Sequence, residues 1–231
     1  MRKSVPRILL AGDTHGCFTH VLEAGKAADV VILLGDQTPK QDLQAELGKF
    51  AEKTWFLLGN HDSDKREYLL RHQSMMDRCL HRKRIDFGGI RIAGLNGVFR
   101  TRYVTVQKDT RLHEMDRETS NCKTRQQYTQ RHGNIPKLAT SIFAEDIKAL
   151  AKLRADVLVT HEAPQTHRYG FQLIGDLAQA MGVKLLVHAH HHERYEADIA
   201  GKIRVLGLGM PTGYNSRQGL AWLDDQLQVK N

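Results

Sequence analysis

The stretch Trp55-Phe56-Leu57-Leu58-Gly59-Asn60-His61-Asp62 decides the fold, because an apolar run passes directly into a polar tetrapeptide. The apolar half predicts a buried strand, and the polar half predicts the loop at its carboxyl end. Four other apolar runs also end in acidic residues or histidines. They are residues 8–11 before Asp13 and His15, 30–34 before Asp36, 157–160 before His161, and 185–187 before His188, His190, His191 and His192. This pattern indicates one site at a sheet edge, where open α/β proteins place their chemistry.

Strand-like runs alternate with helical patterns over residues 17–28 and 41–52. Alternation at βαβ spacing predicts a parallel sheet with right-handed crossovers, so Asp13, Asp36 and Asn60 should lie at the same edge. The near-continuous apolar runs are typical of strands that are covered on both faces. Further helices are predicted over residues 65–76, 142–153 and 173–181, with Ser141 capping the second and Gly182 ending the third.

Residues 98–140 show almost no apolar periodicity and hold nine lysine or arginine residues against four acidic residues. A long segment of this kind is usually a functional lid or is disordered. The net charge is +8, and a basic surface suits a polyanionic partner such as nucleic acid or a nucleotide, although a solvated face would look the same. We therefore predict a single domain over residues 1–231, in which residues 98–140 form a basic lid or cap.

The composition is ordinary for a soluble globular protein, since 41% hydrophobic and 26% charged residues allow one sizeable core. The longest apolar stretch is far too short to cross a bilayer, which predicts no membrane partner. Cys17, Cys79 and Cys122 are widely spaced and form no Cys-x-x-Cys pair. That spacing favours a reduced, cytoplasmic protein over a disulfide framework or a thiolate zinc site. The pattern predicts no particular oligomeric state.

The polar residues at the strand ends have the chemistry of metal ligands. A set of carboxylate, amide and imidazole donors without thiolate suits Mn²⁺, Fe²⁺, Ni²⁺ or Zn²⁺, of which we favour Mn²⁺. Seven ligands are too many for one catalytic ion and suit two. The predicted ligands are Asp13, His15, Asp36, Asn60, His161, His190 and His192.

Two divalent ions would leave a cationic site that attracts phosphate and acidifies bound water. Hydrolysis of a phosphate ester by a metal-held hydroxide follows from that chemistry. His61 is not needed to complete either coordination shell, so we predict that it donates a proton to the leaving oxygen, with Asp62 orienting its ring. Asn60, His61 and His191 are the candidate substrate-binding residues.

Gly12-Asp13-x-His15, Gly35-Asp36, Gly59-Asn60-His61-Asp62, His161 and a terminal His-x-His together resemble the calcineurin-like metallophosphoesterase superfamily over residues 8–192. The resemblance implies a four-layer α/β/β/α sandwich with two central mixed sheets and a bimetal centre. It also implies a division of the ligands. Asp13, His15 and His192 would hold one ion, Asn60, His161 and His190 the other, with Asp36 bridging them and His61 acting on the phosphate.

The last motif departs from the superfamily, which usually shows Gly-His-x-His where this chain has Ala189-His190-His191-His192. One register makes His190 and His192 the ligands, and the other makes them His188 and His190. We favour the first, because Ala replaces Gly in a tight turn more easily than Val187 would.

Residues 89–99 and His161-Glu162-Ala163-Pro164 are similar to stretches in the RNA lariat debranching branch of the superfamily. This likeness suggests phosphodiester substrates. The sequence therefore predicts a phosphoesterase that hydrolyses a phosphodiester or a nucleotide through a metal-bridging hydroxide. A serine/threonine-type protein phosphatase and a catalytically silent binding module of the same fold are the alternatives.

Overall fold

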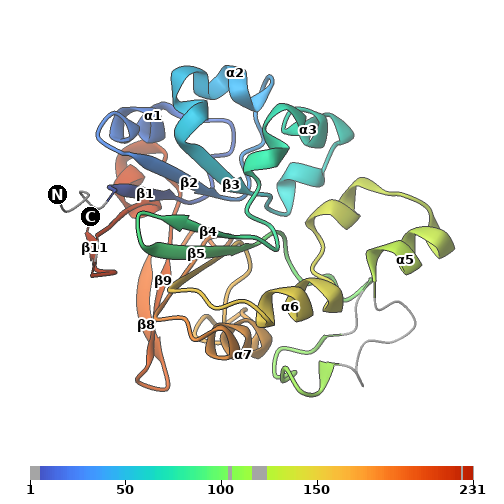
Figure 1. The fold of residues 1–231 in the computed structure, drawn as a ribbon. Helices are drawn as coiled ribbons and strands as arrows, with labels where there is room; N and C mark the ends of the chain where they lie inside the picture. The colour runs from blue at the N-terminus through green and yellow to red at the C-terminus, as the bar shows by residue number, and fades with distance from the viewer. Residues whose placement is uncertain (1–5, 104–105, 116–123, 225, 231) are drawn as a thin grey trace.

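Two mixed β-sheets lie face to face in the computed structural model, which describes residues 6–103, 106–115, 124–224 and 226–230 (Figure 1). The first sheet has five strands in the order β11-β10-β1-β2-β3, and the second has six in the order β4-β5-β6-β7-β9-β8. The first contains β1 (Ile8–Ala11), β2 (Val30–Leu34), β3 (Thr54–Leu57), β10 (Leu220–Leu223) and β11 (Val229–Lys230). The second contains β4 (Arg84–Phe87), β5 (Ile90–Leu95), β6 (Val157–Thr160), β7 (Leu185–His188), β8 (Tyr195–Ile199) and β9 (Ile203–Gly207).

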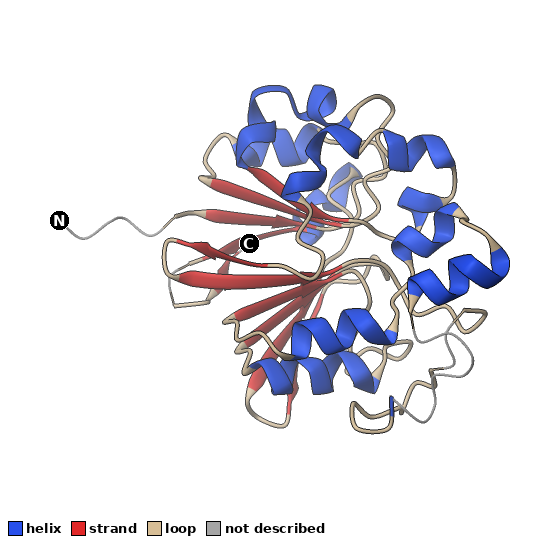
Figure 2. Cartoon of the chain, turned by 45° about the vertical axis from the view of Figure 1, so that its right-hand side comes forward, coloured by secondary structure: helices blue, strands red, loops and turns tan. Residues whose placement is uncertain are grey.

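Helices cover the outer face of each sheet, which gives four layers and confirms the predicted α/β/β/α sandwich (Figure 2). The first sheet is covered by α1 (Thr19–Gly25), α2 (Leu43–Leu47), α3 (Arg66–Leu70) and the 3₁₀ helices η1 (Gly48–Lys53), η2 (His61–Ser63) and η3 (Gln73–Arg78). The second is covered by α6 (Ala144–Ala151) and α7 (Gln172–Met181), and α5 (Arg125–His132), η4 (Pro136–Thr140) and η5 (Gly213–Gly219) lie in connections. No helix in these described ranges is long and apolar enough to cross a membrane.

The strands bury both faces, which explains their continuous apolar runs. In β1, Leu10 packs between the two sheets, whereas its neighbour Leu9 packs under the helices of the first sheet. In β6, Val159 faces the space between the sheets and Leu158 faces α6 and α7. Successive strand residues thus enter different cores, as the two-residue period of a strand requires.

Three expectations about the helices need correction. The predicted helix over residues 41–52 is broken at Gly48, which has a φ of 52°, and the helix over residues 65–76 divides into α3 and η3. Ser141 does not cap α6, because that helix begins at Ala144 and the Phe143 amide donates to the Asp146 carboxylate over 2.9 Å. The end of α7 at Gly182 is confirmed, and that residue has a left-handed φ of 71°.

Residues 98–140 lack apolar periodicity in the sequence. Their described parts nevertheless form helices and pack into the core. Their helix α5 begins with a capping box formed by Thr124 and Gln127. Val106 and Tyr128 are buried in the same core as α6 and α7. The segment leaves and rejoins the scaffold at one point, where the Val98 amide donates to the Thr140 carbonyl over 3.1 Å. Residues 104–105 and 116–123 of the predicted lid lie outside the described residues.

Candidate metal centre

Five strands from both sheets end at one edge of the sandwich. The parallel registers pair Leu34 of β2 with Leu57 of β3, and Thr160 of β6 with His188 of β7. The loops that follow these strands therefore start at similar heights. His161 joins the two sheets there, because its Nδ1 donates to the Leu34 carbonyl over 2.8 Å.

Asp13, His15 and His192 form the first group of possible ligands, whose nitrogen and oxygen atoms lie within 4.8 Å of one another. The His15 and His192 Nε2 atoms approach to 3.1 Å. Both histidines have positive φ angles, 44° and 55°, which turn their side chains back towards Asp13. Asp13 is fully buried and also accepts from the His190 amide over 3.1 Å.

Asp36, His161 and His190 form the second group of possible ligands, with Asn60 beside them. His161 Nε2 lies 3.0 Å from Asn60 Oδ1 and 3.5 Å from Asp36 Oδ2. Because the opposite nitrogen of His161 donates to a carbonyl, Nε2 is the atom left to face a ligand. All seven predicted ligands thus lie together at the sheet edge, although their binding of metal stays a prediction.

Asp36 supplies the carboxylate of the second group, and one of its two oxygens is free to bind a metal ion. Its Oδ1 accepts from the His61 amide over 2.7 Å, whereas Oδ2 is buried and finds no hydrogen-bond partner among the described residues. Two glycines make room, one for this carboxylate and one for the His161 ring. A Cβ on Gly59 would lie 2.2 Å from Asp36 Oδ1, and a Cβ on Gly35 would lie 2.2 Å from His161 Nδ1. An orphaned buried carboxylate oxygen fits a bound cation.

The electrostatics also favour positive charge in this gap. Burial raises the pKa of Asp13 to about 7, because the ionised form has lost its water. Burial alone would lower the pKa of His161, but the Asp36 and Asp13 carboxylates prevail and raise it to about 10. Burial lowers the pKa of His190 to about 2, so this imidazole is neutral, whereas without a bound cation the His161 ring is protonated and balances the charge of the two carboxylates. The donor set fits divalent ions.

The structure places His192, rather than His188, beside Asp13 and His15. His188 is buried within the second sheet, where its Nδ1 donates to the Ala189 carbonyl and its Nε2 accepts from the Tyr195 hydroxyl. Both ring nitrogens are therefore engaged away from the centre. This placement supports the favoured register for the last motif.

His61 borders the centre, but its orienting carboxylate was predicted wrongly. His61 Nδ1 lies 2.6 Å from Oδ2 of Asp64, the residue that directly follows η2. Asp62 is fully buried and uses its two oxygens to accept from the amides of Thr38 and Gly59, at 2.7 and 2.8 Å. Asp62 therefore ties two ligand loops together, and Asp64 orients the ring. The three-residue period of a 3₁₀ turn is the sequence signal that could have identified Asp64.

His191 and Glu162 form a third group of possible ligands together with His190. One nitrogen or oxygen atom of each side chain lies within 4.8 Å of the others. His191 stacks on His167 with 4.0 Å between ring centroids, and its buried Nε2 has no partner among the described residues. Burial raises the pKa of Glu162 to about 7, although the amides of Phe99 and Ala163 donate to it. Sequence reasoning had not singled out Glu162 as a possible ligand.

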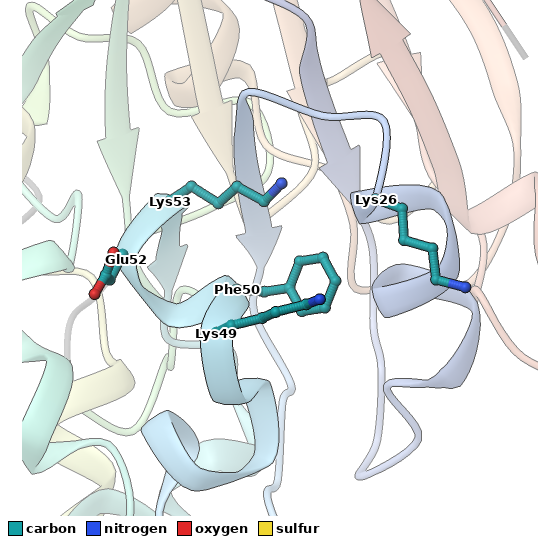
Figure 3. A pocket seen from close by; sticks show the side chains of 5 residues that line it. All are labelled: Lys26, Lys49, Phe50, Glu52 and Lys53. Atoms are coloured by element: carbon teal, nitrogen blue, oxygen red, sulfur yellow. The ribbon is translucent and has the colours of Figure 1, made fainter.

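A pocket of about 520 Å³ lies away from this centre, between α1 and η1 (Figure 3). Lys53 Nζ donates there to the carbonyls of Gly25 and Ala28, just before β2 begins. The pocket is therefore at the opposite end of β2 from Asp36. Its lining residues are Lys26, Lys49, Phe50, Glu52 and Lys53, none of which is a predicted site residue.

Comparisons with known proteins agree with the fold described above. The family model described as calcineurin-like phosphoesterase matches residues 6–194. An uncharacterized protein of Haemophilus influenzae is 39% identical over 194 residues, which cover 81% of this chain and 84% of that protein. Among solved structures, a Thermus thermophilus protein has a TM-score of 0.59 at 14% identity, covering 98% of both chains. A dimetal phosphatase from Danio rerio has a TM-score of 0.53 at 10% identity, covering 90% of this chain and 88% of its own.

Asp62→Asn should lower the free energy of unfolding of the metal-free protein by about 1–3 kcal/mol. The amide has one accepting oxygen, so either the Thr38 or the Gly59 amide loses its partner. Urea denaturation measures the change. Asp64→Asn is the control and should cost no more than about 0.5 kcal/mol, because Asp64 is partly exposed. Equal stability of Asp62→Asn and the unmodified chain would contradict the structural role of Asp62.

Proposed function

The chain belongs to the calcineurin-like phosphoesterase family, and from this premise we propose that it hydrolyses a phosphodiester or a nucleotide with the help of two divalent metal ions. One observation carries the proposal. The Asp36 carboxylate, which follows a strand of the first sheet, has a buried oxygen without a hydrogen-bond partner among the described residues, 3.5 Å from His161 Nε2 of the second sheet. Burying a carboxylate oxygen without a partner is costly, and a shared cation would remove that cost.

In this proposal Asp13, His15 and His192 hold one ion, and Asn60, His161 and His190 hold the other, with Asp36 between them. Mn²⁺ is the favoured ion, and Fe²⁺, Ni²⁺ or Zn²⁺ suit the same donors. Such ions would neutralise charge on the phosphate and lower the pKa of water held there. The protein supplies the geometry, because Gly35 and Gly59 let the ligand loops close on Asp36.

His61 acts on the leaving group. Its ring is about half exposed and lies 5.7 Å from the His15 ring, so it borders the ligands without belonging to either group. Asp64 accepts from Nδ1, which directs Nε2 away from Asp64 as the proton-donating atom. Asn60 and His191 complete the proposed substrate contacts.

A nucleotide is favoured as substrate by an exposed aromatic ring near the centre. The Tyr169 side chain is 52% exposed, and its ring lies 5.8 Å from that of His191, which is itself 4.4 Å from that of His190. Lys108 and Arg168 stand over the ring, at 5.2 and 4.8 Å from its centroid. Exposed cation–π contacts contribute about 0.5–1 kcal/mol, less than the roughly 1–3 kcal/mol of base stacking. A base can therefore displace one cation, which remains available to a phosphate.

The alternatives differ from this proposal in measurable ways. A serine/threonine-type protein phosphatase would prefer an aryl phosphomonoester to an aryl phosphodiester. A catalytically silent module would bind metal and hydrolyse neither. A cytoplasmic location stays a prediction, supported by the free thiols of Cys17 and Cys79.

Chelation should abolish hydrolysis of an aryl phosphodiester, and added Mn²⁺ should restore it. Asp36→Ala should reduce bound metal at both positions, because in this proposal its carboxylate binds both ions, whereas Asn60→Ala should mainly weaken one. Elemental analysis of the purified proteins measures the number of ions per chain. Two ions retained by Asp36→Ala would show that the bridging assignment is wrong.

His61→Ala should leave the metal content intact and slow an ester with an alkoxide leaving group by about 10²- to 10⁴-fold. A nitrophenyl ester should slow much less, because nitrophenolate leaves without a proton. Asp64→Asn should give a milder version of the same pattern. Steady-state rates on the two esters measure the contrast. Equal losses on both would assign His61 to charge stabilisation on the phosphoryl oxygens instead.

Tyr169→Ala should raise KM for a nucleoside phosphodiester by roughly 5- to 150-fold, the equivalent of one lost base stack. A phosphodiester without a base should be nearly unaffected, and Tyr169→Phe should behave like the unmodified chain. Phe50→Ala is the matched control, because its ring also lies near two cationic side chains, Lys49 and Lys53, but at the other end of β2 (Figure 3). An equal rise in KM for both substrates would contradict base stacking.

A further inference from the structure

Arg100 is a half-buried cation at the edge of the metal centre. One of its terminal nitrogens donates to the Asn60 carbonyl and to the Thr140 hydroxyl, each over 3.3 Å. Its Nε is buried and has no hydrogen-bond partner in the described ranges. Burial also lowers the pKa of the guanidinium, although its charge persists. The side chain is thus held in place with donors left over.

Arg100 differs from the neighbouring cations because no carboxylate of the described residues forms a salt bridge with it. Lys137 of the same segment pairs with Asp64, and Arg125 pairs with both Glu145 and Asp146. Cations removed from water are normally paired, since an unpaired buried charge is costly. An unpaired guanidinium beside a metal centre therefore points to an anion that arrives with the substrate.

The surroundings fix where this guanidinium lies. The Thr140 hydroxyl is 2.5 Å from the Ser63 hydroxyl, which in turn donates to the Asn60 carbonyl over 3.2 Å. A backbone hydrogen bond between Val98 and Thr140 holds the two ends of residues 98–140 together, two residues before Arg100. Residues 98–140, which we predict to form a cap, therefore place the Arg100 guanidinium next to the proposed ligand Asn60.

We propose that Arg100 binds a non-bridging oxygen of the substrate's phosphate group at the metal centre. This inference rests on the proposed function and assigns a substrate contact outside the sequence motifs. Charge-assisted hydrogen bonds from a guanidinium to phosphate are stronger than neutral ones. The bonds to Asn60 and Thr140 use both protons of one terminal nitrogen and hold the guanidinium in place, so the other terminal nitrogen is the donor that remains for the phosphate.

The test measures binding of inorganic phosphate to the full-length, Mn²⁺-loaded protein by isothermal titration calorimetry. Arg100→Gln should weaken the affinity by about 10- to 100-fold, because it removes charge-assisted hydrogen bonds. Arg102→Gln is the matched control, since it removes the same charge from an exposed position two residues away. Its affinity should stay within about twofold of the unmodified chain. Metal content and thermal unfolding are measured for every variant.

Unchanged phosphate affinity in metal-loaded Arg100→Gln would overturn the inference. If that variant no longer holds metal, Arg100→Lys decides, because an ammonium group lacks the planar guanidinium that could bond to Asn60, Thr140 and phosphate at the same time. The inference then expects phosphate binding weakened by about 3- to 10-fold, and unmodified affinity would refute it. Failure of the proposed function looks different. In that case the unmodified chain hydrolyses no phosphate ester, while Arg100→Gln still loses affinity for phosphate.

Discussion

The burial of two carboxylates at the shared edge of two sheets is the constraint on which this structure depends. Asp13 and Asp36 are almost completely removed from water, and His161 from the second sheet lies between them. Negative charge in such a place requires compensation, from a protonated histidine or from a bound cation. The close glycines, the positive φ angles and the orphaned Asp36 oxygen all follow from bringing these side chains together.

The sandwich makes that arrangement rigid. Strand residues alternate between the inter-sheet core and the helix-covered faces, so a shift of one residue would expose an apolar set. Hydrogen bonds also link the ligand loops. The Asp62 carboxylate accepts from the amides of Thr38 and Gly59, and His161 of the second sheet donates to the Leu34 carbonyl of the first. The described parts of residues 98–140 pack into the core between the second sheet and its helices. They place Arg100 beside Asn60.

The sequence predicted the features that depend on strong local patterns. Apolar runs located the strands at the site, and polar residues at their ends located the seven candidate ligands, because parallel strands bring their carboxyl ends to one edge. Features set by tertiary contacts were missed. Strand β8 has mostly exposed or half-buried residues and pairs with β9 at the edge of its sheet, and Asp64 reaches His61 through a short 3₁₀ turn. The environment of Arg100 depends on residues 40 positions away in sequence, which no local pattern reveals.

The central claim is that two ions share Asp36. Anomalous diffraction from crystals grown with Mn²⁺ tests it directly. We expect two peaks, both within coordination distance of the Asp36 carboxylate. One should also contact Asp13, His15 and His192, and the other Asn60, His161 and His190. A single peak, or a peak bound by Glu162 and His191 without Asp36, would show that Asp36 does not bind two ions.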